Sequence, residues 1–168
     1  MELHMLSRRR SKMIIDIYGV QRKRDRVLLE DALDFYIMML LPRRISRGIH
    51  VDLSLKKKLD DDVDGWCSVA GYNTCKKARE FEIEICKNRS TRYQLMTLAH
   101  EAVHLKQYAL GEITENMDTW KGRRVPVSTD YYDSPWEIEA HGREKGLYVR
   151  FCEMYGIKFP ITTKERDN

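Results

Sequence analysis

The chain has 168 residues, of which 42% are hydrophobic and 33% charged, and its formal net charge at pH 7 is +4. That length predicts one domain with a core of its own, and the composition is ordinary for a soluble globular protein. So small a net charge does not by itself indicate a nucleic-acid partner. The longest apolar run, residues 37–41, is far too short to cross a bilayer, so we expect no membrane partner.

The cysteines and the N-terminal residues are the features that predict the cellular compartment of the protein. The four cysteines, Cys67, Cys75, Cys86 and Cys152, contain no C-x-x-C pair, which argues against a structural zinc knuckle. The first residues are polar and then basic, with no apolar segment after them, so no signal peptide is expected. These features predict a cytoplasmic protein with free thiols, or one of the host cytoplasm if a phage encodes the chain.

The first third of the chain predicts two strands around one helix. Residues 1–12 are expected to form a mobile or loosely attached arm, and residues 13–20 have strand character. Residues 27–41 predict a helix that is apolar nearly all round, and therefore mostly buried, with Pro42 ending it. Residues 49–55 alternate between apolar and polar side chains, which is typical of a half-buried strand.

The middle of the chain predicts a hairpin followed by a helix. Residues 66–72 and 81–86 are the two expected strands, joined by a long connection. Residues 93–110 contain no Gly or Pro and predict a helix, with Ser90 as its N-cap and Gly111 at its end.

The last third predicts a long connection and a final helix. Residues 112–134 form the connection, with strand-like pieces near Trp120 and Val125, and residues 135–155 are the expected helix. The fold class is therefore α+β: a small antiparallel or mixed sheet packed on three helices, in one domain over residues 13–160.

Residues 100–104 read His-Glu-Ala-Val-His, which is an H-E-x-x-H motif on the predicted helix. Positions i and i+4 lie one turn apart on the same face, so His100 and His104 can bind one metal ion. Glu101 lies about 100° around the helix axis from His100, where it can reach a metal-bound water without being a ligand. The alternative is a pair of histidines partly buried on an amphipathic helix.

A catalytic zinc usually takes three protein ligands, and the third is sought in the last helix. A helical projection places Glu137 at the centre of the buried stripe, with His141 also inside, and Glu139 on the solvent side, where it would serve solubility. Glu144 is also on the inner face. The remaining stripe consists of Ala140, Leu147, Tyr148, Phe151, Cys152 and Tyr155.

Glu137 has a competing interpretation. Ser134-Pro135-Trp136-Glu137 also fits a capping box, in which the Glu137 carboxylate bonds the backbone of Ser134. In that case His141 becomes the third ligand; otherwise His141 can orient the other ligands from one turn away.

The chain resembles the gluzincins, the glutamate-liganded branch of the H-E-x-x-H zinc metallopeptidases, and most of all their minimal members: small phage-encoded peptidases, SprT-like domains and small repressor-cleaving regulators. The match covers about residues 66–155 and rests on two strands, the motif helix and a helix that opens with Trp136 and Glu137. His141 departs from the family, which has an acidic or amide residue there. The resemblance implies a zincin-like fold and a substrate strand at residues 66–72.

These observations predict a zinc-dependent endopeptidase, a hydrolase that uses a zinc-bound water with Glu101 as general base. Zn²⁺ is the expected cofactor, a peptide or protein the expected partner, and Tyr131, Tyr132 or His141 the expected oxyanion donor. The rival hypothesis is a zinc-binding regulatory or DNA-binding module without peptidase activity. It would use the basic clusters, which are at residues 8–12, 22–26, 43–47 and 56–58 and are also typical of solvated loops.

Overall fold

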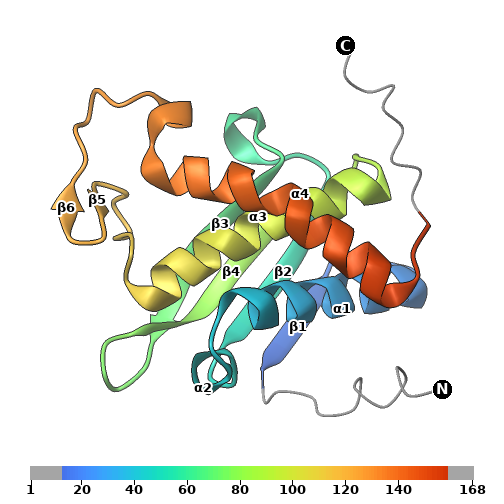
Figure 1. Ribbon diagram of the computed structural model, residues 1–168. Helices are drawn as coiled ribbons and strands as arrows, with labels where there is room; N and C mark the ends of the chain where they lie inside the picture. The colour runs from blue at the N-terminus through green and yellow to red at the C-terminus, as the bar shows by residue number, and fades with distance from the viewer. Residues whose placement is uncertain (1–12, 159–168) are drawn as a thin grey trace.

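The computed structural model describes residues 13–158, and in it the helices cover one face of a four-stranded sheet (Figure 1). The expected arm at residues 1–12 and the last two residues of the expected domain, 159–160, lie outside the described residues. The sheet strands are β1 (Ile14–Tyr18), β2 (His50–Lys56), β3 (Gly65–Tyr72) and β4 (Ala78–Cys86).

The sheet is mixed, as an α+β fold allows, and its order is β1-β2-β4-β3. β1, β2 and β4 are mutually parallel, whereas β3 is antiparallel to β4 and forms one edge of the sheet. The predicted hairpin is confirmed, with a connection of residues 73–77 that is shorter than expected. Asn73 holds this turn, because its side-chain oxygen accepts from the backbone amides of Cys75 and Lys77.

The long helices are α1 (Lys23–Leu40), α3 (Thr91–Leu110) and α4 (Pro135–Tyr155). α1 and α3 pack on the sheet, and α4 crosses over α3 and α1 (Figure 1). The shorter elements are α2 (Arg43–Ser46), the 3₁₀ turns η2 (Asp60–Asp62) and η3 (Tyr131–Asp133), and a two-stranded ribbon of β5 (Thr119–Trp120) and β6 (Arg123–Arg124).

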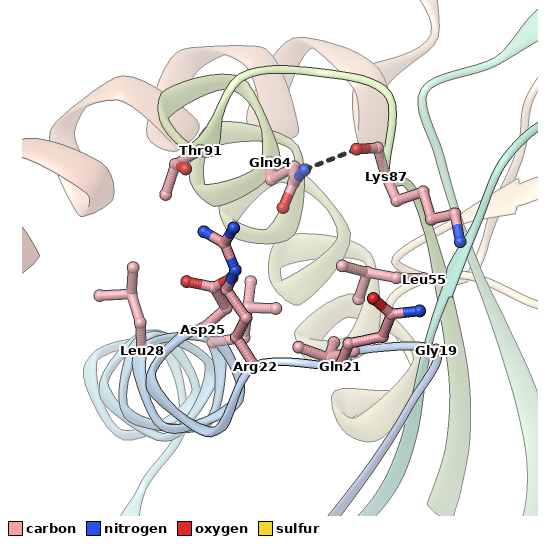
Figure 2. Close-up of a pocket in the computed structure, with 11 residues that line it drawn as sticks. Gly19, Gln21, Arg22, Asp25, Leu28, Leu55, Lys87, Thr91 and Gln94 are labelled. Carbon is pink, nitrogen blue, oxygen red and sulfur yellow. Dashed lines mark hydrogen bonds between the residues drawn. The ribbon is translucent and has the colours of Figure 1, made fainter.

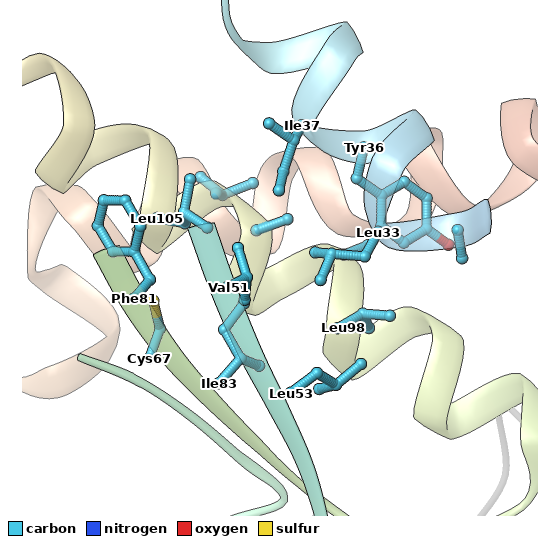
Figure 3. Packing of buried hydrophobic residues seen from close by; sticks show 14 of the residues in the cluster. Leu33, Tyr36, Ile37, Val51, Leu53, Cys67, Phe81, Ile83, Leu98 and Leu105 are labelled. Atoms are coloured by element: carbon cyan, nitrogen blue, oxygen red, sulfur yellow. The ribbon is translucent and has the colours of Figure 1, made fainter. Parts of the chain in front are cut away.

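The core lies between the sheet and the helices (Figure 3). Strand residues alternate as predicted: Val51 and Leu53 of β2 point inward beside Phe81 and Ile83 of β4. Helix side chains complete it, among them Leu33 of α1, Leu98 and Leu105 of α3 and Phe151 of α4. Burying these side chains is the main stabilising contribution to the fold.

The prediction for the first helix was wrong about how much of its surface is buried. α1 is helical as predicted, but Val27, Met38 and Met39 are exposed, so the helix is not buried all round. The sheet and α3 cover only one side of α1, and α4 reaches only part of the rest. An apolar side chain on the uncovered side therefore remains in water.

The structure can be compared with the predictions of free thiols and of no segment that crosses a membrane. All four cysteines lie in the described part of the chain, and all are free thiols. Among residues 13–158 no helix combines the length and the apolar character that crossing a bilayer requires.

Candidate metal centre

α3 carries the motif, and its ends are fixed as the sequence predicted. Ser90 caps the N-terminus, where its Oγ accepts from the backbone amide of Tyr93. Gly111 ends the helix in the left-handed conformation, with φ at 70°. Both residues stabilise the ends of the helix. Ser90 satisfies a backbone amide, and Gly111 adopts the left-handed conformation without the strain that a Cβ would cause. The motif residues lie in the middle of α3, where the helix faces α4.

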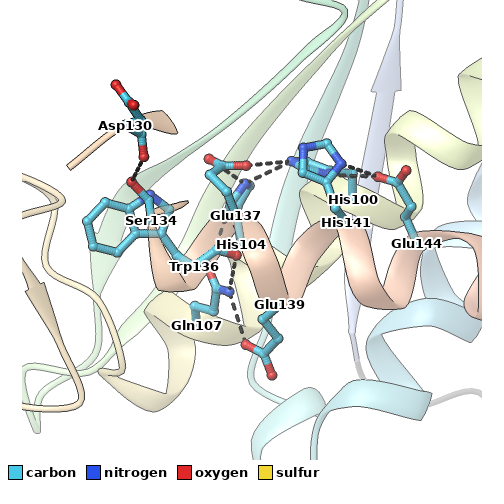
Figure 4. Close-up of polar contacts among 10 residues, drawn as sticks. All are labelled: His100, His104, Gln107, Asp130, Ser134, Trp136, Glu137, Glu139, His141 and Glu144. Atoms are coloured by element: carbon cyan, nitrogen blue, oxygen red, sulfur yellow. Dashed lines mark hydrogen bonds and ion pairs between the residues drawn. The ribbon is translucent and has the colours of Figure 1, made fainter. Parts of the chain in front are cut away.

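Three ligand-type side chains converge there from two helices (Figure 4). His104 Nε2 lies 3.1 Å from His100 Nε2, and Glu137 of α4 places Oε2 3.2 Å from His100 Nε2 and Oε1 3.5 Å from His104 Nε2. All three residues are buried. A tetrahedral zinc site with bonds of about 2.0–2.1 Å has ligand–ligand edges of about 3.3–3.4 Å, so the spacing fits a metal ion.

The other ring nitrogen of each histidine is already bound. His100 Nδ1 lies 2.8 Å from Glu144 Oε2, and His104 Nδ1 lies 2.9 Å from the side-chain oxygen of Gln107. Both partners are acceptors, so each Nδ1 donates and, in the neutral imidazole, each Nε2 presents its lone pair to the centre. This is the orientation that metal-binding histidines usually have.

The carboxylate of Glu137 supplies a second fit test. Its Oε2 is buried and makes no well-formed hydrogen bond among the described residues, although it faces His100 Nε2 at 3.2 Å, which is unusual for a buried polar atom. An unsatisfied buried oxygen is costly unless something binds it. The residues therefore form a buried His-His-Glu group that can hold a metal ion.

Electrostatics at this centre favour positive charge. Burial lowers the pKa of His100, but the carboxylates of Glu137 and Glu144 outweigh burial and raise it to about 10. Burial raises the pKa of Glu137, yet the two imidazoles hold it well below its usual range. A proton or a metal ion at the histidines would provide the charge that these carboxylates stabilise.

Glu101 is buried beside the centre and is not one of the three converging ligands. Burial raises the pKa of its carboxyl most strongly, His104 and His100 lower it, and the result is about 7. A carboxyl with a pKa near neutral pH is well matched to accepting and releasing a proton. Its Oε1 packs against the backbone of Gly65, at the first residue of β3.

The capping-box interpretation of Glu137 does not fit the contacts. Ser134 is the N-cap of α4, but its side chain makes no capping bond, and its Oγ donates to the carbonyl of Asp130 instead. The Glu137 carboxylate faces the two histidines. His141 was expected to be the third ligand only if Glu137 belonged to a capping box. Because the capping box is absent, that expectation no longer applies.

The prediction for Glu139 was wrong. Its carboxylate is mostly covered and accepts from Lys106 Nζ at 2.7 Å, Gln107 Nε2 at 3.0 Å and Arg143 Nε at 3.1 Å. The helical projection gave the direction of Glu139 correctly relative to Glu137. It could not show that α3 presents a buried lysine on that side of α4.

The three candidate oxyanion donors lie at the rim of the centre. His141 is not inside as expected, since its side chain is 41% exposed, and its ring lies over His100 with centroids 4.6 Å apart. Tyr131 and Tyr132 of η3 are also exposed, and both rings lie near His141. Burial and then Glu137 raise the pKa of Tyr131, so its hydroxyl keeps its proton at neutral pH.

Other clusters and cavities in the described residues are less convincing as sites. His100, His141 and Glu144 form a second, more exposed group, and Asp16, His50 and Asp52 form a third on the solvent face of the sheet. A cavity between the starts of α1 and α3 contains none of the motif residues (Figure 2). Its lining includes Arg22, Asp25, Lys87, Thr91 and Gln94.

Comparison of the chain with models of protein families and with curated proteins found no match. The site therefore has to be judged on its own geometry. Sequence reasoning missed Gln107, Lys106 and Gly65. One signal was present: Gln107 follows His104 by three positions, a spacing at which side chains on a helix meet.

Proposed function

We propose that this chain is a zinc-dependent endopeptidase of the gluzincin type, in which His100, His104 and Glu137 hold the metal. The observation that carries the proposal is the pair of Nε2 atoms and the buried Glu137 carboxylate, which converge with spacings of 3.1–3.5 Å. Support for zinc over other metals comes from the donor set, because two imidazoles and one carboxylate are a common catalytic zinc environment.

Zinc, when bound, would polarise the scissile carbonyl and lower the pKa of water toward about 7. Glu101 then acts as the general base: its carboxylate accepts a proton from the attacking water and passes it to the leaving amine. Two features support this role: Glu101 is buried beside the three converging side chains, and it is not one of them. In the metal-free centre its carboxyl has a pKa of about 7, so it can both accept and release a proton near neutral pH.

An extended peptide is the substrate form that the sheet would favour. β3 is an edge strand, and its first residue, Gly65, lies against Glu101. A peptide that pairs with an exposed edge uses main-chain hydrogen bonds, so its backbone would run past the general base. Tyr131, Tyr132 and His141, whose rings lie together at the rim of the centre, are the donors that we propose for the developing oxyanion.

The test combines metal analysis with a change at the base. Purified protein prepared without added metal should contain about one zinc per chain, and Glu101→Gln should retain it, because Glu101 is assigned no bond to the metal. Cleavage of an unfolded protein substrate should fall by about 10²–10⁴-fold, the usual cost of losing a general base.

Glu153→Gln is the matched control, since Glu153 is exposed on α4 and should change neither quantity. No zinc after addition and desalting would exclude the metal centre. A Glu101→Gln variant that cleaves as fast as the parent would exclude the assigned base. Zinc binding without cleavage of any unfolded or DNA-bound protein, together with salt-dependent DNA binding, would favour the regulatory alternative instead.

A further inference from the structure

We propose that Gln107, held in place by Glu139 and the buried Lys106, is the positioning residue that directs His104 Nε2 to the metal. The inference rests on the proposed metal centre and adds a set of residues that the motif does not contain. It is carried by hydrogen bonds that fix which end of the Gln107 amide faces the histidine.

The orientation of the amide follows from its partners. Gln107 is completely buried, and its Nε2 lies 3.0 Å from the carbonyl oxygen of Trp136 and 3.0 Å from Glu139 Oε2. Both partners can only accept, so they need the two hydrogens of the amide nitrogen. The amide oxygen is left to face His104 Nδ1, at 2.9 Å. A flipped amide would set oxygen against two acceptors.

This orientation determines the tautomer of His104. An amide oxygen cannot donate, so the hydrogen between the two groups belongs to Nδ1 of the histidine. In neutral His104 the lone pair is then on Nε2, the atom 3.1 Å from His100 Nε2 and 3.5 Å from Glu137 Oε1. Gln107 thereby holds His104 in the metal-binding tautomer and ring orientation before a metal binds, which lowers the free-energy cost of binding.

Lys106 and Glu139 hold the acceptor in position. Lys106 is 7% exposed and lies between two carboxylates, 2.7 Å from Glu139 Oε1 and 2.6 Å from Glu112 Oε2. Arg143 contacts Glu139 from the solvent side. A buried cation with two carboxylate partners is strongly constrained, because moving either partner leaves charge unpaired. The Glu139 carboxylate therefore has one place to lie, and Gln107 is fixed by it (Figure 4).

The same lysine reaches the connection between α3 and α4. Glu112 begins that connection, and Lys121 both contacts its carboxylate at 3.6 Å and donates a backbone hydrogen bond to its carbonyl. The positioning network thus joins α3, α4 and the loop between them at one buried point.

Gln107→Met tests the proposal, because methionine is similar in size but its sulfur is only a weak acceptor for the His104 Nδ1 hydrogen. Zinc affinity, measured by competition with a chelating dye, should fall by about 10–100-fold, the usual effect of losing such a contact. Gln94→Met is the matched control: Gln94 also lies on α3, and its amide donates to two backbone carbonyls, of Lys87 and Arg89, away from the histidines. It should leave zinc affinity unchanged.

A second readout separates positioning from stability. Cobalt replaces zinc and reports its ligand geometry by visible absorption, so the Gln107→Met spectrum should differ from that of the parent, whereas the Gln94→Met spectrum should not. Gln107→Glu should also weaken binding, since it sets two carboxylates together. Adding Glu139→Gln to it should recover part of the affinity, because a carboxylate at position 107 can accept from both His104 and the new amide.

Each outcome has one meaning. Zinc affinity and cobalt spectrum that are the same in Gln107→Met and the parent would overturn the positioning role while leaving the metal centre intact. If Gln107→Met does not fold, Gln107→Glu with and without Glu139→Gln decides, and no recovery in the double variant would overturn the role. A parent protein that binds no zinc would overturn both this inference and the proposed function.

Discussion

Gly65 is the residue at which the sheet meets the proposed general base. A Cβ added there would lie 2.6 Å from Glu101 Oε1 and 2.5 Å from Thr97 Cγ2, closer than such atoms normally approach. The carboxylate of Glu101 is buried, so a side chain at position 65 would displace it within the core. Glycine at position 65 therefore leaves the space that the Glu101 carboxylate occupies.

Gly65→Ala should fold and bind zinc, yet cleave unfolded protein about 100-fold more slowly, because a displacement of about 1 Å at a catalytic group can have that effect. Steady-state kinetics with zinc analysis would measure both. Gly48→Ala is the control, since a Cβ at position 48 makes only ordinary contacts at 3.7 Å and beyond. Equal rates for the two variants would contradict the prediction.

From the sequence, a single residue could be interpreted only where its role depends on the geometry of its own helix. His100, Glu101 and His104 could be chosen because their spacing alone sets their relative directions. Glu137 could be chosen by its place in the apolar stripe. Glu139 could not be interpreted, because its role depends on Lys106, which lies 33 positions earlier on another helix. Helical projection describes one helix and contains nothing about its neighbours.

At the scale of elements, a glycine inside α4 and a glycine directly after it should respond to replacement in opposite ways. Gly146 is exposed in the middle of α4, and a Cβ there would meet nothing within 4 Å. Gly156 follows the helix with φ at 63°, a conformation that favours glycine. The same change to alanine is therefore favourable at one position and unfavourable at the other.

Gly146→Ala should raise the free energy of unfolding by about 1 kcal/mol, since glycine is a poor helix former. Gly156→Ala should lower it by about 1 kcal/mol, because the left-handed conformation strains a Cβ. Urea unfolding followed by circular dichroism would measure both changes. Effects of the same sign would show that helix propensity and backbone strain do not control this helix.

The sequence predicted well which segments are helices and strands. It did not predict which faces of the helices are covered by other elements. Ser90, Gly111 and Pro135 mark helix ends by local chemistry, which the sequence contains. Whether a face is covered depends on which elements pack there. α1 was expected to be mostly buried, yet several of its apolar side chains are exposed, whereas α3 is buried from residue 98 to residue 109, Lys106 included.

For the whole molecule, metal binding should be coupled to folding stability. The three proposed ligands lie on α3 and α4, so a bound ion would join two helices and be lost when they separate. A ligand that binds only the folded state stabilises it, by about 2.7 kcal/mol at a concentration one hundred times its Kd.

The melting temperature should therefore fall by several degrees when a chelator removes zinc, and recover on adding it back. Scanning calorimetry of both forms would show this. A variant with His100→Ala and His104→Ala provides the control, because its melting temperature should not respond to zinc. A parent protein with the same melting temperature in both forms would contradict a folded metal centre.

The order of the strands is a whole-molecule property that the sequence left open. The pattern of apolar residues predicted each strand and the hairpin between β3 and β4. It did not predict that β4 would lie next to β2, parallel to it, and so move β3 to the edge. That arrangement depends on which hydrophobic faces meet when the helices pack, and the alternation within one strand is the same in either order.

All residues of α3 from Leu98 to Ala109 are buried, and this determines where the backbone can open to solvent. A segment with no exposed position cannot open by itself; its backbone amides meet solvent only when α1, α4 and the sheet separate from it, which is global unfolding. The histidines and Glu101 therefore belong to the most slowly opening part of the molecule. The segment of residues 121–133 is largely exposed, so we expect its backbone to open to solvent at a lower free-energy cost than that of α3.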